Sequence, residues 1–245
     1  MDRRHTKNME AFIKFKDKDL SQIYNHYSEE FDKDEILQNH RFHIEKYNLG
    51  FGERDFHAMW KDIINLMPPK FKFLEIGVYK GQVLSLVKLL SDHNNKEIEF
   101  YGVSPLNDVG DKFSKYESTD YLFLINGLFN HFNLDFDPGI NLIEGSSNDI
   151  EIKAKIESLK HFDLMYIDGS HDYEFVISDI ELMKSVCSPG AIIVFDDSAC
   201  YKNLPSDKFR GHIDVCDAIR DKIENDSNFI EVLCVGHNRV FRKLN

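Results

Sequence analysis

Residues 71–92 read FKFLEIGVYKGQVLSLVKLLSD, and this stretch decides the fold. A short apolar run comes first, a turn with two glycines follows, and a segment with helical periodicity completes the unit. A continuous apolar run is typical of a strand that is buried on both faces, as in a parallel sheet covered by helices. The stretch therefore predicts one strand–helix unit of such a sheet.

The same unit recurs along the chain. Four more apolar runs, each followed by a segment of helical period, lie at residues 97–104, 140–147, 162–168 and 190–197. The first of these is followed by a long helical segment that reaches about residue 133. Strands that alternate with helices in this way predict a doubly wound α/β domain.

The end of the chain departs from this alternation. A helical segment at 212–226 precedes two final apolar runs, 229–236 and 239–244, which only His237 and Asn238 separate. Because a parallel crossover needs a dozen residues or more, these runs must form an antiparallel hairpin. The sequence thus predicts a seven-stranded, mostly parallel, Rossmann-like sheet with an antiparallel last strand.

Residues 1–70 have a different character. They contain amphipathic segments with mixed charge and end at Pro68 and Pro69, which predicts helices. We expect residues 1–56 to form an N-terminal helical extension that caps the sheet, forms a lid or makes a homo-oligomer contact. Residues 57–245 would then form the α/β domain.

The charge excludes one class of partner. Asp and Glu number 42 against 30 Lys and Arg, so the formal net charge is −12, and no basic cluster interrupts this balance. Such a chain would repel a phosphate backbone. We therefore expect no nucleic-acid partner.

Location and redox state follow from what the sequence contains. No stretch approaches the ~20 apolar residues of a membrane span, and the first twelve residues lack the apolar core of a secretory signal. We expect a cytoplasmic protein without a membrane span. Cys187, Cys200, Cys216 and Cys234 form no CxxC pair and have no histidine at zinc spacing, so we expect reduced, packed thiols.

The turn after the first apolar run has the form E-x-G-x-x-x-G, from Glu75 to Gly81. Gly77 would let the backbone approach a ligand, and Gly81 would allow tight packing of strand against helix. Since ligands of open α/β sheets bind at the carboxyl ends of the strands, this turn would be one wall of the site. A purely structural turn is the alternative, and the absence of G-x-G-x-x-G disfavours NAD.

From about residue 57 to residue 245 the chain resembles the class I S-adenosylmethionine-dependent methyltransferases. LEIGVYKG at 74–81 is similar to their first motif, and their sheet ends with the same inserted antiparallel strand. D-G-S-H-x-Y at 168–173 and P-G-A-I-I-V-F-D-D at 189–197 resemble the metal-dependent O-methyltransferases that act on sugars of macrolides and of surface polysaccharides. A branch known as cephalosporin hydroxylase is related.

Two acidic strand ends carry the predicted chemistry. Asp168 ends the fourth apolar run, and Asp196 and Asp197 end the fifth, so all three carboxylates should meet at one sheet edge. They would repel one another unless a cation neutralised them, and oxygen ligands favour Mg²⁺, with Mn²⁺ possible. His171 would accept the proton of the reacting hydroxyl. Turn or capping roles are the alternatives for each residue taken singly.

The resemblance implies further contacts with S-adenosylmethionine. Glu75 resembles the acid that meets the amino group of the methionine moiety, with a structural role as the alternative, and Tyr79 lies in the same motif. Ser104 stands where many members have an acid for the ribose, so Asp108 is a possible substitute. Ser146 lies in a region that resembles the adenine site, although a plain polar turn explains it equally well.

The expected acceptor is a sugar that is nucleotide-activated or part of a surface polysaccharide such as a capsule. Lys202, Lys208, Arg210 and His212 follow the fifth apolar run and would face a diphosphate if they were not simply solvated. The alternatives are a small-molecule hydroxylase or oxidoreductase of the related branch, and a non-catalytic ligand-binding protein of the same fold.

Overall fold

The computed structural model describes residues 12, 15 and 18–244. The strands are β1 (Lys70–Ile76), β2 (Glu97–Ser104), β3 (Leu142–Glu144), β4 (Phe162–Ile167), β5 (Cys187–Phe195), β6 (Phe229–Val235) and β7 (Asn238–Lys243). The helices are α2 (Leu20–Asp32), α3 (Glu35–Tyr47), α4 (Arg54–Leu66), α5 (Gln82–His93), α6 (Tyr121–His131), α7 (Pro138–Asn141), α8 (Ile150–Leu159), α9 (Tyr173–Val186), α10 (Ile213–Ile219) and the π-helix η1 (Arg220–Glu224).

The strands form one seven-stranded sheet in the order β3-β2-β1-β4-β5-β7-β6. Strands β1 to β5 pair in parallel, whereas β7 is antiparallel to both β5 and β6. Strand β7 therefore inserts between β5 and β6, and the predicted hairpin and doubly wound Rossmann-like fold are both confirmed.

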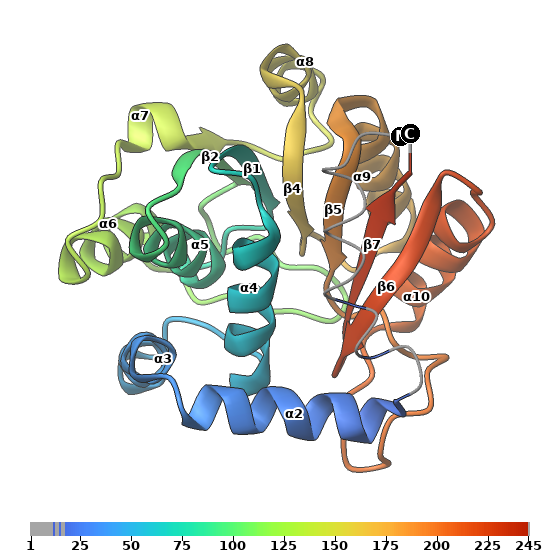
Figure 1. The fold of residues 1–245 in the computed structure, drawn as a ribbon. Helices are drawn as coiled ribbons and strands as arrows, with labels where there is room; N and C mark the ends of the chain where they lie inside the picture. The colour runs from blue at the N-terminus through green and yellow to red at the C-terminus, as the bar shows by residue number, and fades with distance from the viewer. Residues whose placement is uncertain (1–11, 13–14, 16–17, 245) are drawn as a thin grey trace.

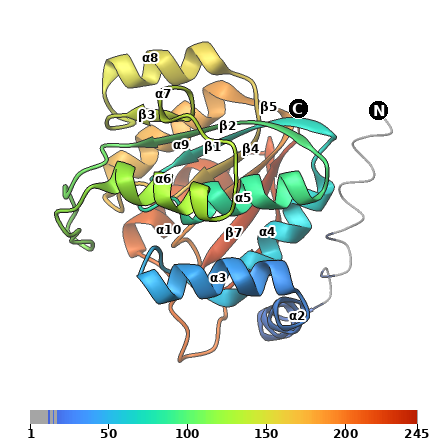
Figure 2. The ribbon, with the colours of Figure 1, turned by 90° about the vertical axis from the view of Figure 1, so that its left-hand side faces the viewer.

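Helices cover both faces of this sheet. Phe71 and Phe73 of β1 point into a core that α4, α5 and α6 complete, while Leu74 and Ile76 point into a second core beneath α8, α9 and α10 (Figure 1). The view from the side shows α5 and α6 lying in front of the strands (Figure 2). Because consecutive side chains point into opposite cores, apolar residues follow one another directly in the centres of these strands.

The first crossover after β2 is longer and less helical than the sequence predicted. Helix α6 begins only at Tyr121, where the side chain of Asp120 accepts a hydrogen bond from the Phe123 amide at 2.8 Å. Residues 105–120 form a loop without helix. This loop folds over the carboxyl ends of the strands and contributes to the site described below.

From Leu20 onward the N-terminal segment is mostly helical, as its pattern indicates; the part of the predicted extension at residues 1–11, 13–14 and 16–17 lies outside the described residues. Asp19 and Gln22 form a reciprocal capping box at the start of α2. Helix α2 runs beneath α4 and reaches β6 (Figure 1). The boundary expected between residues 56 and 57 falls inside α4, which spans Arg54–Leu66; the division into extension and domain remains a proposal.

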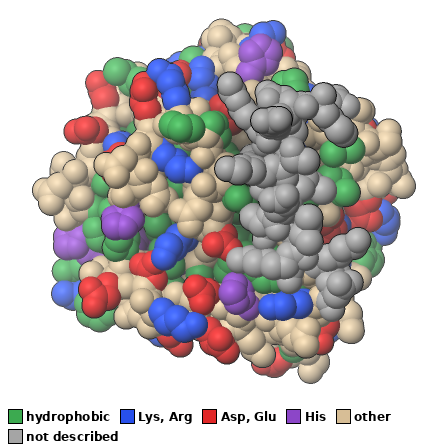
Figure 3. Space-filling model, in the orientation of Figure 1, with side chains coloured by type: hydrophobic (Ala, Val, Ile, Leu, Met, Phe, Trp, Pro, Cys, Tyr) green, Lys and Arg blue, Asp and Glu red, His purple; other side chains and the backbone are tan. Residues whose placement is uncertain are grey.

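The surface mixes charges of both signs. On the face drawn in Figure 3, acidic and basic side chains are interspersed wherever side chains are coloured. Among the helices that the structure describes, none combines the length and apolar character needed to cross a bilayer.

Two cysteines contradict the expectation of four reduced thiols. Cys200 and Cys216 form a disulfide with their Cα atoms 5.9 Å apart, although they are 16 positions apart in sequence. The loop after β5 folds back so that Ser198 pairs with Gly211, and this brings Cys200 against α10. A spacing of this kind has no recognisable pattern in the sequence. Cys187 and Cys234 are buried free thiols, as expected.

Candidate functional site

A cavity of about 660 Å³ lies at the carboxyl ends of strands β1 to β5. The ends of these strands and the loops that follow them line it at residues 75–79, 103–105, 145–147, 168–172 and 196–197. Aromatic residues before and within α4 close the other side. Both the place and the size suit a small-molecule site of an open α/β sheet.

Gly77 positions the first loop of this cavity. Its φ is +99°, and a Cβ built on it would lie 1.8 Å from the backbone oxygen of Asp168. Gly77 is thus required because the loops after β1 and β4 touch there, whereas the sequence argument attributed it to contact with a ligand. Gly81 has a φ of +86° and serves as the N-cap of α5.

Glu75 ends β1 beneath the same loop. Burial raises its pKa well above the usual range, although the backbone amide of Leu84 in α5 donates a hydrogen bond to it. This contact satisfies one amide at the start of α5, since Gly81 has no side chain to do so. The other oxygen, Oε2, is buried without a hydrogen-bond partner among the described residues. Glu75 therefore combines the structural role with a free acceptor in the cavity wall.

The three predicted carboxylates do lie together. Asp168 hydrogen-bonds with Asp196, and burial together with the charges of Asp196 and Asp197 raises the pKa of Asp168 well above its usual range. Burial is also the largest cause of the raised pKa of Asp196. This electrostatic cost is what a bound cation would remove.

His171 is held between two carboxylates. Its Nδ1 lies 2.7 Å from Oδ2 of Asp111 and its Nε2 lies 3.0 Å from Oδ2 of Asp197. Burial lowers the pKa of this imidazole, but the hydrogen bonds and charges of Asp197 and Asp111 outweigh burial, and the net shift is upward. With Nδ1–H donated to Asp111, Nε2, which faces Asp197, is the atom that carries the exchangeable proton.

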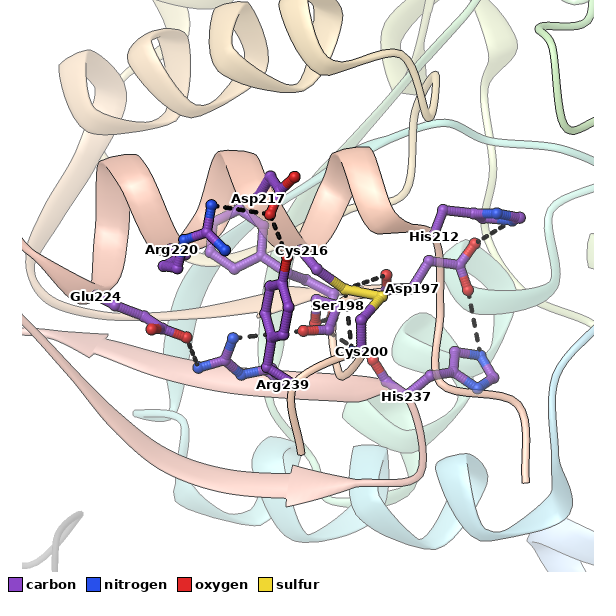
Figure 4. Close-up of a disulfide and its surroundings, with 12 residues drawn as sticks. Asp197, Ser198, Cys200, His212, Cys216, Asp217, Arg220, Glu224, His237 and Arg239 are labelled. Atoms are coloured by element: carbon purple, nitrogen blue, oxygen red, sulfur yellow. Dashed lines mark hydrogen bonds and ion pairs between the residues drawn. A yellow bond between two sulfur atoms is a disulfide. The ribbon is translucent and has the colours of Figure 1, made fainter. Parts of the chain in front are cut away.

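Two more histidines flank Asp197. His212 Nε2 lies 3.4 Å from Oδ2 of Asp197, and His237 Nε2 lies 3.6 Å from Oδ1 of the same carboxylate (Figure 4). His237 Nε2 also lies 3.3 Å from Oδ1 of Asp196. The chain thus places imidazoles on both sides of one carboxylate.

The remaining predicted cofactor residues divide into two groups. Tyr79, Ser104 and Ser146 line the cavity, and the ring of Tyr79 stacks on that of Phe51 with centroids 5.0 Å apart. Asp108 is exposed and is not among the residues that line the cavity. The structure therefore does not bring Asp108 to the cavity as a replacement for Ser104.

The predicted acceptor residues also divide. His212 lines the cavity, whereas Lys202, Lys208 and Arg210 do not. Lys202 pairs with Glu231 at 2.8 Å, Lys208 donates to the hydroxyl of Tyr24 at 2.6 Å, and Arg210 donates to a backbone carbonyl of its own loop. Because these cations have partners elsewhere, they do not form the diphosphate-facing group that the sequence suggested.

The residues present fit a divalent cation and a nucleoside-type cofactor. Carboxylates and imidazoles form two groups that share Asp197, one with His171 and His212 and the other with Asp196 and His237. Asp196 Oδ1 has no hydrogen-bond partner in the described part of the chain. The cavity adjoins this cluster and has Glu75 Oε2 as a further buried acceptor. Asp196 Oδ1 and Glu75 Oε2 are thus buried acceptor atoms without a hydrogen-bond partner among the described residues, and such atoms suit a bound cation or a cofactor amino group.

Sequence reasoning missed Asp111 and His237. Asp111 lies in a loop that resembled a helix, and His237 lies in the hairpin turn between the last strands, where polar residues are ordinary. It also missed the aromatic wall formed by Phe51, Phe56 and Trp60. Only the repeated strand ends carried a signal, because their position in the fold is predictable.

Among curated proteins, the chain is similar to the uncharacterized protein R132 of Acanthamoeba polyphaga mimivirus, with 29% identity over 157 residues. That match covers 62% of this chain and 64% of the relative, so it spans less than two thirds of the relative's length.

Solved structures show the same fold at low identity. The O-methyltransferase from Bacillus cereus in complex with SAH has a TM-score of 0.55 at 13% identity, and covers 86% of this chain and 91% of that one. The O-methyltransferase TomG from Streptomyces achromogenes, in complex with SAM, has a TM-score of 0.54 at 11% identity with the same coverage. These likenesses confirm the class I methyltransferase fold.

A family model described as a methyltransferase domain matches residues 74–198. The match contains all five strand ends that form the cavity and covers about half of the chain. The chain therefore belongs to this methyltransferase-domain family.

Proposed function

We propose that this protein transfers a methyl group from S-adenosylmethionine to a hydroxyl of a sugar, with assistance from a divalent metal ion. The observation that carries the proposal is the shared cavity: the glycine turn after β1 and the cluster around Asp168, His171 and Asp197 line one space. A methyl donor and an acceptor hydroxyl held there would lie next to a proton acceptor.

Residues along the strand ends would hold the cofactor. Glu75 Oε2, a buried acceptor without a partner among the described residues, suits the amino group of the methionine moiety. Ser104 and Ser146 offer hydroxyls at the ends of β2 and β3. S-adenosylmethionine supplies a methyl group on a sulfonium, which an oxygen nucleophile attacks in line with the departing sulfur.

Asp168, Asp196 and Asp197 would hold the metal. A divalent cation held there would lower the pKa of a bound hydroxyl and would neutralise the buried carboxylates. The three side chains come from the ends of two adjacent parallel strands, so the sheet itself sets their separation. Burial, together with repulsion from neighbouring carboxylates, raises the pKa values of Asp168 and Asp196, and a bound cation would relieve that repulsion.

His171 would take the proton of the acceptor hydroxyl at Nε2. Asp111 holds Nδ1 at 2.7 Å and its Oδ2 also accepts the backbone amide of His171 at 2.8 Å, so the ring cannot rotate freely. An imidazole oriented by a carboxylate in this way is a recurrent general base. A neutral His171 would accept the proton, and the charge of Asp111 would stabilise the imidazolium that forms.

Support for a sugar comes from the resemblance of residues 168–173 and 189–197 to sugar O-methyltransferases and from the cavity wall. Rings of Phe51, Tyr79 and Tyr116 line the same cavity as the polar cluster, a combination that suits the apolar faces and the hydroxyls of a sugar. Nucleotide-activated sugars and surface-polysaccharide sugars are therefore the acceptors to screen first.

Calorimetric titration with S-adenosylmethionine and S-adenosylhomocysteine, before and after EDTA treatment, tests the cofactor. We expect micromolar binding of both. A panel of nucleotide sugars and capsule-type oligosaccharides, followed by mass spectrometry for a gain of one methyl group, tests the reaction. Failure of both cofactor forms to bind would reject the methyltransferase proposal and revive a non-catalytic role or the hydroxylase alternative.

A further inference from the structure

The hairpin turn between β6 and β7 brings His237 against the two acidic residues that follow β5. His237 Nε2 lies 3.3 Å from Oδ1 of Asp196 and 3.6 Å from Oδ1 of Asp197. The three donor atoms all lie within 4.8 Å of one another. Because β7 pairs antiparallel with β5, the turn that precedes β7 must lie beside the end of β5.

Asp196 Oδ1 and His237 Nε2 lie close together without a hydrogen bond between them. Asp196 Oδ1 is buried and makes no hydrogen bond with any described residue, although an imidazole nitrogen lies 3.3 Å away. Bonds of about 2.1 Å from a metal, meeting at angles between 90° and 110°, place neighbouring donors roughly 3.0–3.5 Å apart. The separations of Nε2 from the two carboxylate oxygens are close to this range.

His237 is fixed in this position. The residue is only 6% exposed. Its ring makes edge contacts with the rings of Phe56 and Phe209, whose centroids lie 4.7 Å and 5.1 Å from its own. Its backbone oxygen accepts the amide of Ser198 at 2.9 Å, directly after Asp197. The imidazole is therefore preorganised, and little conformational entropy would be lost on ligation.

We propose that His237 is a metal ligand together with Asp196 and Asp197, and that this mixed nitrogen–oxygen set selects a first-row transition-metal ion over Mg²⁺. The role of this metal in methyl transfer rests on the proposed function, whereas the assignment of His237 as a ligand does not. Mg²⁺ favours oxygen ligands, whereas imidazole suits Fe²⁺, Co²⁺ and Zn²⁺, whose affinities for nitrogen donors are higher. The expectation of Mg²⁺ considered carboxylates alone, because the sequence does not show that His237 reaches them.

The other side of Asp197 provides a matched comparison. Its Oδ2 faces His171 at 3.0 Å and His212 at 3.4 Å, while Oδ1 faces His237. The carboxylate of Asp197 thus separates His237 from His171, and Figure 4 shows His237 and His212 on either side of it. If the metal lies on the Oδ1 side, substitution of His237 should weaken its binding far more than substitution of His212.

The test measures metal affinity of the EDTA-stripped protein by calorimetry and by the visible absorption of Co²⁺. We expect His237→Asn to weaken Co²⁺ binding by at least about tenfold and to change Mg²⁺ binding by less than about threefold. His212→Asn should leave Co²⁺ affinity within about threefold, and exposed His93→Asn should leave it unchanged. Unaltered Co²⁺ affinity in His237→Asn, or an equal loss in His212→Asn, would overturn the assignment.

A gain-of-signal variant guards against misfolding. His237→Cys should add a sulfur-to-Co²⁺ charge-transfer band in the near ultraviolet, which appears only when residue 237 touches the metal. Circular dichroism of each variant reports folding, and a folded His237→Cys protein that binds Co²⁺ without this band would contradict the proposal.

Cofactor binding separates this inference from the proposed function. Titration of S-adenosylhomocysteine into the metal-stripped protein reports on the cofactor site alone. If the metal-stripped wild-type protein does not bind S-adenosylhomocysteine but His237→Asn still weakens Co²⁺ binding, the methyltransferase proposal is rejected and the metal-ligand proposal stands. If the protein binds S-adenosylhomocysteine but His237→Asn leaves Co²⁺ affinity unchanged, the metal-ligand proposal is rejected and the methyltransferase proposal stands.

Discussion

Oδ2 of Asp111 lies 2.7 Å from Nδ1 of His171, although 60 positions separate the two residues in sequence. The same oxygen accepts the backbone amide of His171 at 2.8 Å. Asp111 therefore selects both the tautomer and the orientation of the imidazole. The loop after β2, which contributes no strand or helix of its own over residues 105–120, supplies the residue that prepares the proposed general base.

Asp111→Asn should lower turnover of the accepted sugar by about 10- to 100-fold, because the ring of His171 loses its orienting charge. We expect the affinity for S-adenosylhomocysteine to change by less than about threefold. Initial rates and calorimetry measure the two effects. Asp108→Asn is the matched control, since Asp108 lies in the same loop but does not line the cavity; equal losses in both variants would contradict the role of Asp111.

Gly77→Ala should lower the free energy of unfolding by about 1–3 kcal/mol, since the added Cβ would meet the backbone oxygen of Asp168 at a φ of +99°. Cofactor binding should weaken as well, because the loop that carries Asp168 must move. Urea denaturation and calorimetry measure these changes. Gly127→Ala, in α6 with open space around its Cβ, should be neutral or stabilising. Full affinity in Gly77→Ala would refute the contact.

Acid should destabilise the protein through two buried histidines on α3 and α4. His40 Nδ1 lies 3.0 Å from His57 Nε2. Burial lowers the pKa of His40 to about 3 and that of His57 well below its ordinary value of 6.5. The unfolded chain therefore binds protons that the folded chain does not, and stability falls as the pH drops below about 6.5, by at most about 1.4 kcal/mol per pH unit for each histidine.

Urea denaturation between about pH 7.5 and about pH 5 measures this dependence. In His40→Gln the free energy of unfolding should fall less steeply with decreasing pH, because unfolding then takes up as much as one proton fewer. The exposed His93→Gln should leave the slope as it is. An identical slope in wild type and His40→Gln would show that His40 is protonated in the folded protein.

The Cys200–Cys216 disulfide should contribute to stability. It closes a chain segment 16 positions long, for which the loss of unfolded-state entropy amounts to about 2–4 kcal/mol. Dithiothreitol should lower the free energy of unfolding by this amount, as measured in urea. A Cys200→Ser/Cys216→Ser double variant should be insensitive to the reductant. Thiol labelling of the unfolded, unreduced protein should find two free cysteines, Cys187 and Cys234; four would rule the disulfide out.

The sequence by itself determined the sheet and one edge of the site. Apolar runs buried on both faces must be parallel strands under helices, and the two-residue gap at His237 and Asn238 permits only a hairpin. Since parallel strands end at one edge, Asp168 and Asp196 were predictable neighbours. Local pattern sufficed for these because strand direction and burial are properties of short segments.

Only the tertiary structure decided the rest. Asp111 reaches His171 across a loop without periodic pattern, and His237 reaches Asp196 because β7 inserts between β5 and β6. Lys202 turns away from the cavity because Glu231 of β6 is its nearer partner. Such contacts depend on the packing of segments that are distant in the chain, and local residue type and spacing do not predict that packing.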